Sequence, residues 1–162
     1  MCRIAAYLGP PMSLEGFLTA PPHSLHRQSW APREQLTATV NADGFGVAWL
    51  DGDRRPAVYT STSPAWADPN LDGLGRSLVS PLWLGNVRSA TAGMTVNLAN
   101  TQPFVHGDWL YTHNGFVQDF AHALRARLNR FLEPHIQADI VGTTDSEYLF
   151  ALLRQLLELG LE

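Results

Sequence analysis

The chain contains a single cysteine, Cys2, and this limits the ways in which its fold can be stabilised. One cysteine makes no intrachain disulfide and no cysteine-based zinc site, so the fold must depend on a hydrophobic core. The chain has 162 residues, 45% of them apolar, with five Trp and seven Phe, which is enough for such a core. We therefore predict one domain over residues 1–162 and expect a reducing compartment, the cytoplasm.

The charge of the chain argues against partners that carry many phosphates. The net charge is -4 with only eleven Lys and Arg, and no basic run gives a footprint for nucleic acid or an anionic membrane. No stretch approaches the roughly 18 apolar residues of a membrane helix, and the N-terminus lacks the pattern of a secretory signal. We expect a small-molecule ligand, with no nucleic acid and no membrane as partner.

Short apolar runs bounded by Gly, Pro and Asp predict strands in the first two thirds of the chain. The first should end at Gly9-Pro10-Pro11, and the run at 82–87 has the composition of a central strand. Gly44 and Gly46, two residues apart, indicate a place where another segment passes close to the backbone. The predicted strands lie at residues 2–8, within 41–50, 57–61, 82–87 and 109–112, with short helices within 13–18 and 68–79 and a long loop at 23–39.

After Gly115 the apolar period changes from two to about 3.6, which predicts helices. Thr144 and Glu147 have the spacing of a capping box at the start of a second helix, which we expect to end at Gly160. The first helix should be amphipathic and pack on a sheet. Its apolar face is predicted to consist of Phe116, Phe120, Leu124, Leu128 and Leu132.

The position of Cys2 gives it a second chemical group if the initiator Met1 is removed. A thiol is a strong nucleophile that is mostly protonated at neutral pH, so it needs a base close by. A free α-amino group has a pKa of about 7.7–8.0 and can be that base, directly or through one water. A chance cysteine at position 2 is the alternative, so the hypothesis depends on the rest of the chain.

Three further motifs would complete a site for such a nucleophile. Asn114 and Gly115 offer a side-chain amide and an uncrowded N–H to an oxyanion. Arg88, which follows an apolar strand, can hold a carboxylate through two parallel hydrogen bonds, with Thr91 adding a third. Asp145 can accept an ammonium group at a helix start. Together they would hold the α-amino-acid end of a glutamyl group while Cys2 attacks the γ-carbonyl.

Each motif taken singly has a simpler explanation. Asn114-Gly115 is also a hairpin-turn sequence, although a helical pattern follows it here. Arg88 could be a surface residue at a strand end, and Asp145 could only complement the helix dipole. His23 and His26 lie three residues apart without the pattern of a metal site, so we predict no metal and no cofactor.

Six motifs in order resemble a class II glutamine amidotransferase domain of the N-terminal nucleophile (Ntn) hydrolase superfamily. The resemblance implies an α+β fold, the Ntn-hydrolase αββα four-layer sandwich. Its later strands lie beyond residue 162 in such domains, so we expect the second sheet to be C-terminally incomplete. The motifs are Met1-Cys2, Asn41-Ala-Asp-Gly-Phe-Gly46, Val87-Arg88-Ser-Ala-Thr91, Asn100-Thr-Gln-Pro-Phe104, His113-Asn-Gly115 and Thr144-Asp-Ser-Glu147.

Within that family, Gln28-Ser-Trp-Ala-Pro32 and Arg88-Ser-Ala-Thr91 are similar to the ergothioneine-pathway γ-glutamyl hydrolases of the EgtC type. The resemblance implies hydrolysis of a γ-glutamyl amide through a thioester on the cysteine, with release of glutamate. It implies that Cys2, Asn114 and Gly115 are catalytic. The substrate-binding residues would be Arg88, Thr91, Gln102, His113 and Asp145, where Gln102 replaces a histidine common in relatives.

Two other functions remain open at this point. A glutaminase subunit would deliver ammonia to a synthetase partner, and a non-catalytic domain would only bind γ-glutamyl groups. The sequence also leaves a homo-oligomer open. The group attached to the glutamyl moiety is not encoded in these motifs, and we expect the loop at 23–39, with Trp30, to form its wall.

Overall fold

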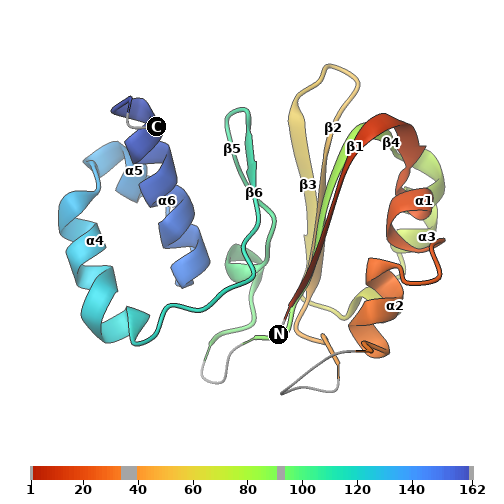
Figure 1. The fold of residues 1–162 in the computed structure, drawn as a ribbon, viewed down its shortest axis with the longest axis horizontal. Coiled ribbons are helices and arrows are strands. Elements are labelled where there is room, and N and C mark those ends of the chain that lie inside the picture. The colour runs from red at the N-terminus through yellow and green to blue at the C-terminus, as the bar shows by residue number, and fades with distance from the viewer. Residues whose placement is uncertain (1, 34–39, 91–93, 161–162) are drawn as a thin grey trace. The chain divides into compact units, whose positions relative to one another are not determined.

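The fold was obtained as a computed structural model that describes residues 2–33, 40–90 and 94–160 (Figure 1). The chain divides into two compact units, Met1–Asn114 and Gly115–Glu162. Each unit has a hydrophobic cluster of its own. Among the described residues, no helix has both the length and the apolar character needed to span a bilayer.

The first unit is built on a four-stranded antiparallel sheet with the strand order β1-β4-β2-β3. Its strand β4 lies between two others, as predicted for the apolar run at residues 82–87. A two-stranded sheet, β5-β6, follows later in the chain. The strands are β1 (Arg3–Ser13), β2 (Phe45–Leu50), β3 (Pro56–Ser61), β4 (Val79–Val87), β5 (Phe104–His106) and β6 (Trp109–Tyr111).

The two faces of the four-stranded sheet pack against different neighbours, because side chains alternate between faces along each strand. A Cβ on Gly85 would lie 2.9 Å from Leu25 Cδ2, on the face covered by helices. A Cβ on Gly46 would collide with the carbonyl oxygen of Gln102, just before β5. This confirms the close approach predicted at Gly46. Figure 1 shows the helices α1–α3 on one side of the sheet and the β5-β6 hairpin on the other.

Short helices cover the first face and close the core. Ser13 caps the first of them by accepting a hydrogen bond from Gly16 N at 3.1 Å. The core combines these helices with inward residues of the sheet, including Phe45, Val47 and Trp83. The helical segments are α1 (Leu14–Leu18), α2 (Leu25–Trp30), η1 (Ala65–Ala67), α3 (Leu71–Ser77) and η2 (Leu98–Asn100).

Strand β1 does not end at Gly9-Pro10-Pro11, so that prediction was wrong. The strand continues to Ser13, with a register irregularity between Leu8 and Met12. β1 is an edge strand that pairs only with β4 in this sheet. Proline is tolerated there because its missing N–H need not serve a second neighbour.

The long loop predicted at residues 23–39 is also partly wrong, because it contains the helix α2. Ser24 caps this helix by accepting from Arg27 N at 3.1 Å, and Leu25 is buried in the core. A six-residue helix with one buried aliphatic side chain has too little periodicity to be seen in the sequence. Residues 34–39 lie outside the described part of the chain.

The second unit is helical, and its first helix is shorter than predicted. Phe116 is 62% exposed and precedes the first helical residue, so it does not join the apolar face. Phe120, Leu128 and Leu132 are buried as predicted. The segments are η3 (Phe120–Leu124, a π-helical turn), α4 (Arg125–Phe131), α5 (Pro134–Ala138) and α6 (Asp145–Glu158).

The start of α6 confirms one half of the predicted capping box and corrects the other. Thr144 Oγ1 accepts a hydrogen bond from Glu147 N at 3.3 Å. The Glu147 carboxylate accepts instead from Val141 N at 2.9 Å and Gly142 N at 2.8 Å. Glu147 therefore fastens the preceding loop to the helix. At the other end Gly160 has φ +69°, the helix stop expected there.

Glu147 predicts a pH dependence of stability. Burial raises the pKa of its carboxyl above the ordinary 4.5, partly offset by the two backbone hydrogen bonds. A raised folded-state pKa contributes stability at low pH that is lost as pH rises through it. We expect Glu147→Gln to lower the free energy of unfolding by about 1–3 kcal/mol, because the two N–H groups bond to different carboxylate oxygens and the amide nitrogen that replaces one of them cannot accept.

The test is denaturant unfolding of both proteins at pH values from below the ordinary pKa of 4.5 up to neutral pH. The stability difference between wild type and Glu147→Gln should shrink as pH rises, because only the wild type loses stability through this group. A difference that grows with pH would contradict the assignment. Glu133→Gln is the control, because Glu133 is exposed and its side chain makes no capping hydrogen bond to α5.

Candidate active site

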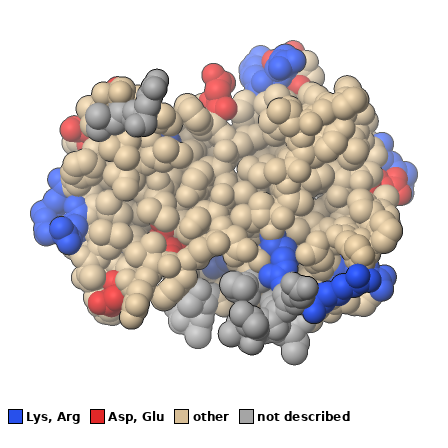
Figure 2. Space-filling model, viewed as in Figure 1, with Lys and Arg blue, Asp and Glu red and all other residues tan. Residues whose placement is uncertain are grey.

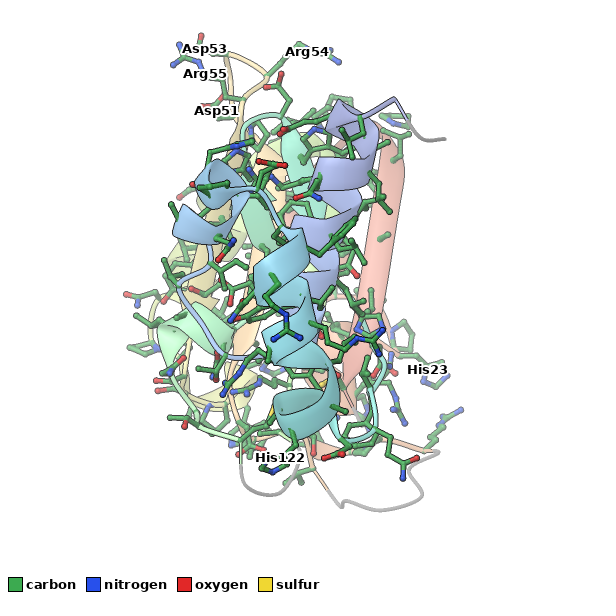
Figure 3. All side chains as sticks on the ribbon, turned by 90° about the vertical axis from the view of Figure 1, so that its left-hand side faces the viewer. His23, Asp51, Asp53, Arg54, Arg55 and His122 are labelled. Atoms are coloured by element: carbon green, nitrogen blue, oxygen red, sulfur yellow. The ribbon has the colours of Figure 1, made fainter. Side chains whose placement is uncertain are left out.

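Three segments of the first unit meet at one end of the four-stranded sheet. In the antiparallel register Arg3 and Phe45 both pair with Val87, so β1 and β2 begin where β4 ends. Cys2 precedes β1 and Arg88 follows β4, which brings these two predicted residues to the same end. The turn between β2 and β3 lies at the opposite end, where Figure 3 labels Asp51, Asp53, Arg54 and Arg55.

Cys2 is partly exposed and its sulfur contacts the segment after β4. Ser89 N donates to Cys2 Sγ at 3.4 Å, and Ser89 O lies 3.6 Å from the same sulfur. Arg3 Nη1 and Asn114 Nδ2 both donate to the Cys2 carbonyl, at 3.2 and 2.9 Å. These two bonds hold the carbonyl group of Cys2, and the residue stays partly exposed.

Arg88 is buried, with 6% of its surface exposed, so it is not a surface residue at a strand end. Its guanidinium donates to Asp43 O at 3.5 Å and to Thr95 O at 3.3 Å. Burial lowers the pKa of Arg88, while electrostatic interactions with Cys2 and Asp43 raise it. A guanidinium has five N–H donors and these bonds use two of them. A buried guanidinium next to the thiol is suited to holding a carboxylate.

The turn at residues 41–44 locks the Arg88 segment in place. Arg88 N donates to Gly44 O at 2.8 Å, and Asp43 N donates to Arg88 O at 3.1 Å. The Asp43 carboxylate accepts from Ala90 N at 2.8 Å. Gly44 has φ +105°, which a glycine adopts without strain. Asp43 is a structural partner of the site that the sequence did not single out.

Asn114 is brought to the nucleophile, because its side-chain amide donates to Cys2 O at 2.9 Å. It follows strand β6 and a short link, Thr112 and His113. The Asn114 amide therefore contacts the backbone carbonyl of the same residue that carries the thiol. The same group is the one predicted to stabilise an oxyanion. The hairpin-turn alternative for Asn114-Gly115 is excluded, since β6 is followed by helical structure.

Gln102 holds the link before Asn114. Its Oε1 accepts from His113 N at 2.6 Å and from Thr112 Oγ1 at 2.9 Å. Thr112 Oγ1 in turn accepts from Asn86 Nδ2 at 3.0 Å. The amide oxygen of Gln102 is thus engaged with protein donors, and the substrate-binding role given to Gln102 and His113 stays a prediction.

The remaining predicted residues are not placed at the nucleophile by the structure. Thr91 lies outside the described residues. Gly115 and Asp145 belong to the second unit. There, Asp145 is 4% exposed and accepts from Val117 N at 2.8 Å and Ser146 N at 2.8 Å. Its predicted role in binding an ammonium group stays a prediction.

Outside this region, the charged side chains of the described residues were compared with the requirements of a second site. On the face drawn in Figure 2, those of the described residues stand in small separate groups. No three described His, Cys, Asp or Glu residues are arranged to hold a metal ion. Burial lowers the pKa of His26, opposed by Asp72, which indicates a partly buried imidazole in the α2 region.

Three positions in the described site were missed by sequence reasoning: Asp43, Asn86 and Thr112. Asn86 and Thr112 sit in strand-like runs, where a polar side chain gives no signal until its partner across the fold is known. Asp43 was noted only as part of a turn. Its spacing from Gly44 and Gly46 is the signal that could have marked it.

Comparison with known proteins identifies the family. The sequence model of class-II glutamine amidotransferases matches residues 14–160. The chain therefore belongs to the class-II glutamine amidotransferase family. A solved structure, a glutamine aminotransferase class-II domain protein from Silicibacter pomeroyi, superposes with a TM-score of 0.66 at 28% identity. The superposition covers 99% of this chain and 60% of the Silicibacter pomeroyi chain. This similarity confirms the predicted Ntn-type mixed α and β fold.

Curated relatives carry more specific names. Gamma-glutamyl-hercynylcysteine sulfoxide hydrolase of Mycobacterium tuberculosis (strain CDC 1551 / Oshkosh) is 40% identical over 117 residues, 72% of this chain and 50% of the relative. The protein of that name in Mycolicibacterium smegmatis is 34% identical over 159 residues, which are 98% of this chain and 70% of the relative. Probable glutamine amidotransferase DUG3 of Saccharomyces cerevisiae is 34% identical over 166 aligned residues, which cover 98% of this chain and 46% of the relative. The chain spans about half the length of the M. tuberculosis relative.

Proposed function

We propose that this protein hydrolyses a γ-glutamyl amide through a thioester on Cys2 and releases glutamate. The observation that carries the proposal is the arrangement around the thiol. Asn114 Nδ2 lies 2.9 Å from the carbonyl oxygen of Cys2, and the buried Arg88 directly precedes Ser89, whose N–H donates to the thiol sulfur at 3.4 Å. An amide donor and a carboxylate-binding cation next to one nucleophile suit a glutamyl substrate.

The reaction follows from the chemistry of these groups. With Met1 removed, the α-amine of Cys2 takes the thiol proton while the sulfur bonds to the γ-carbonyl carbon. Asn114, with the N–H of Gly115, stabilises the negative oxygen. The C–N bond then breaks as the amine returns the proton to the leaving nitrogen. Water activated by the same amine cleaves the thioester, which yields glutamate and restores the thiol.

The substrate end of the proposal assigns the two charges of the glutamyl group. Arg88, aided by Thr91, would bind the α-carboxylate and Asp145 the α-ammonium. The carboxylate of Asp145 already accepts two backbone hydrogen bonds, yet its about four lone-pair positions leave room for a further donor such as an ammonium group. A thiol nucleophile has to stay reduced. We therefore propose that the protein acts in the cytoplasm, where thiols are kept reduced.

The leaving group is proposed from the relatives. The mycobacterial relatives are named for a γ-glutamyl sulfoxide conjugate, so we propose a γ-glutamyl sulfoxide of this kind, in an ergothioneine pathway. Trp30 is 45% exposed at the end of α2 and lies under the Arg27 guanidinium at 5.2 Å. This aromatic surface is our candidate for the wall of the leaving group.

The test is a comparison of glutamate release from glutathione, L-glutamine and a γ-glutamyl sulfoxide conjugate. We expect the sulfoxide conjugate to have the highest kcat/KM. Free glutamine as the only substrate, with a rate that rises when a synthetase is added, would select the glutaminase alternative. Binding of all three without glutamate release would select a non-catalytic γ-glutamyl-binding domain.

Arg88 gives a prediction for substrate affinity. In Arg88→Lys a point charge replaces the planar fork, so the bidentate contact with the α-carboxylate is lost. We expect KM to rise at least about tenfold, equivalent to about 1.4 kcal/mol, with a smaller change in kcat. Steady-state kinetics of glutamate release measure both. Arg76→Lys, on the exposed side of α3, is the control and should behave as wild type. An unchanged KM in Arg88→Lys would exclude the carboxylate role.

A further inference from the structure

A chain of polar side chains connects the central strand to the segment that carries Asn114. It runs from Asn86 Nδ2 to Thr112 Oγ1 at 3.0 Å, from Thr112 Oγ1 to Gln102 Oε1 at 2.9 Å, and ends on His113 N, 2.6 Å from the same oxygen. Asn86 is 2% exposed and Gln102 is 9% exposed. The two amide side chains are therefore shielded from water, with Thr112 half-buried between them, so loss of a bond partner leaves a buried amide group unpaired, which is costly.

The direction of every bond in this chain is fixed by one backbone group. His113 N–H can only donate, so the Gln102 atom facing it must be the amide oxygen. The Thr112 hydroxyl next to that oxygen must then donate its one proton to it. With its proton used, the hydroxyl accepts from Asn86, which presents its amide nitrogen. The bonds thus have one consistent arrangement, with no alternative orientation of either amide.

This series of hydrogen-bonded side chains starts on the face of the sheet that also carries the site. Ile4 pairs with Asn86 and Gly46 pairs with Asn86, and paired residues share a face. Gly46 is the residue whose open side admits Gln102. Arg88 is two positions after Asn86, the spacing that returns a side chain to the same face. The same end of β4 thus positions both Arg88, the cation beside the thiol, and Asn86, the first donor in the series of hydrogen-bonded side chains.

We propose that Asn86, Thr112 and Gln102 are positioning residues that hold Asn114 in the geometry it needs to stabilise the oxyanion. This rests on the proposed function. His113, fixed by Gln102, immediately precedes Asn114, whose amide lies 2.9 Å from Cys2 O. None of the three needs to touch the substrate, and for Gln102 the positioning role is proposed in place of the substrate-binding role that the resemblance implies. Their effect reaches the reaction through the position of one amide group.

The test variants each remove one link with little change in volume. Thr112→Val removes the hydroxyl, and Gln102→Met removes the acceptor. We expect kcat to fall at least about tenfold in either, with KM changed less than threefold or so, because the lost contact serves the transition state. Thr112→Ser restores the hydroxyl and should return kcat to within about threefold of wild type. The double variant should lose no more than the worse single one, since the residues act as a unit.

Ser80→Ala is the matched control for loss of a buried hydrogen-bonded group. Ser80 is on the same strand, fully buried, at the end of β4 away from Arg88, and bonds Leu50 O at 3.0 Å. It should lower the melting temperature without lowering kcat. A tenfold or so fall of kcat in Ser80→Ala, or wild-type kcat in Thr112→Val, would overturn the proposal.

A second readout separates this proposal from the proposed function. Hydrogen exchange of the His113 amide, followed by NMR, reports its bond to Gln102 without any substrate. We expect faster exchange in Thr112→Val and Gln102→Met, and wild-type exchange in Thr112→Ser and Ser80→Ala. If the wild type hydrolyses no γ-glutamyl amide, the proposed function fails and the exchange pattern still decides whether the chain holds His113. Unchanged His113 exchange in both Thr112→Val and Gln102→Met overturns the positioning role.

Discussion

Replacing Cys2 by alanine is expected to lower the rate of glutamate release at least about 10³-fold, because loss of a covalent nucleophile removes the whole two-step route. The fold should persist, since the hydrogen bonds of the sulfur within the described residues are two weak ones to the Ser89 backbone, at 3.4 and 3.6 Å. Glutamate production measures the rate, and thermal unfolding compares the stability of the two proteins.

Two controls make this result specific. Cys2→Ser keeps an oxygen at the same place but lacks the nucleophilicity of a thiol, so it should be nearly as slow as Cys2→Ala. Because Cys2 is the chain's one cysteine, a thiol-alkylating reagent modifies this site alone. Alkylation should abolish activity in proportion to its extent. Turnover that survives both the alanine substitution and full alkylation would refute a thioester mechanism.

The second large effect is expected at Asn114. In Asn114→Ala the amide donor facing the oxyanion is lost, which costs about 10²–10³ in kcat at comparable sites. KM should change much less, because the ground-state carbonyl needs this donor less than the oxyanion does. Steady-state kinetics on the preferred γ-glutamyl substrate separate the two constants.

Asn70→Ala is a matched control for this substitution. Asn70 Nδ2 makes a side-chain hydrogen bond of 2.9 Å to Tyr59 Oη, the same length as the bond from Asn114 to Cys2. Its loss should leave kcat unchanged. If Asn114→Ala raises KM and spares kcat, Asn114 binds the substrate and is not part of an oxyanion hole.

Some features of the fold could be predicted from the sequence because the residues there give a local signal. The apolar run at 82–87 indicated a central strand, and β4 occupies that position. Gly46 indicated a close approach, and Gln102 O fills it. Both features depend on residues whose own properties reveal their surroundings: long apolar side chains need burial, and glycine admits a neighbour.

The errors have a common physical origin, which is tertiary context. Pro10 and Pro11 end most strands but are tolerated in β1, since it lies at the edge of the sheet. Glu147 was expected to cap its own helix, yet its carboxylate finds two N–H groups of the preceding loop. In both cases the local rule was overruled by a partner whose position no local pattern encodes.

The residues of the site show the same difference between local signals and tertiary context. Cys2, Arg88 and Asn114 were predicted from their chemistry, and the first unit brings Cys2 into contact with Asn114 and beside Arg88. The residues that hold them, such as Asp43 and Asn86, act through backbone and amide hydrogen bonds between segments far apart in sequence. Those pairings become visible only in the folded chain.

The most direct measurement is mass spectrometry of the N-terminal peptide after rapid acid quenching of the enzyme during turnover. If one residue supplies both the attacking sulfur and the base, the peptide must begin at Cys2 and a fraction of it must carry a glutamyl group on sulfur. An active enzyme whose N-terminal peptide retains Met1, or never carries the glutamyl group, would contradict the account.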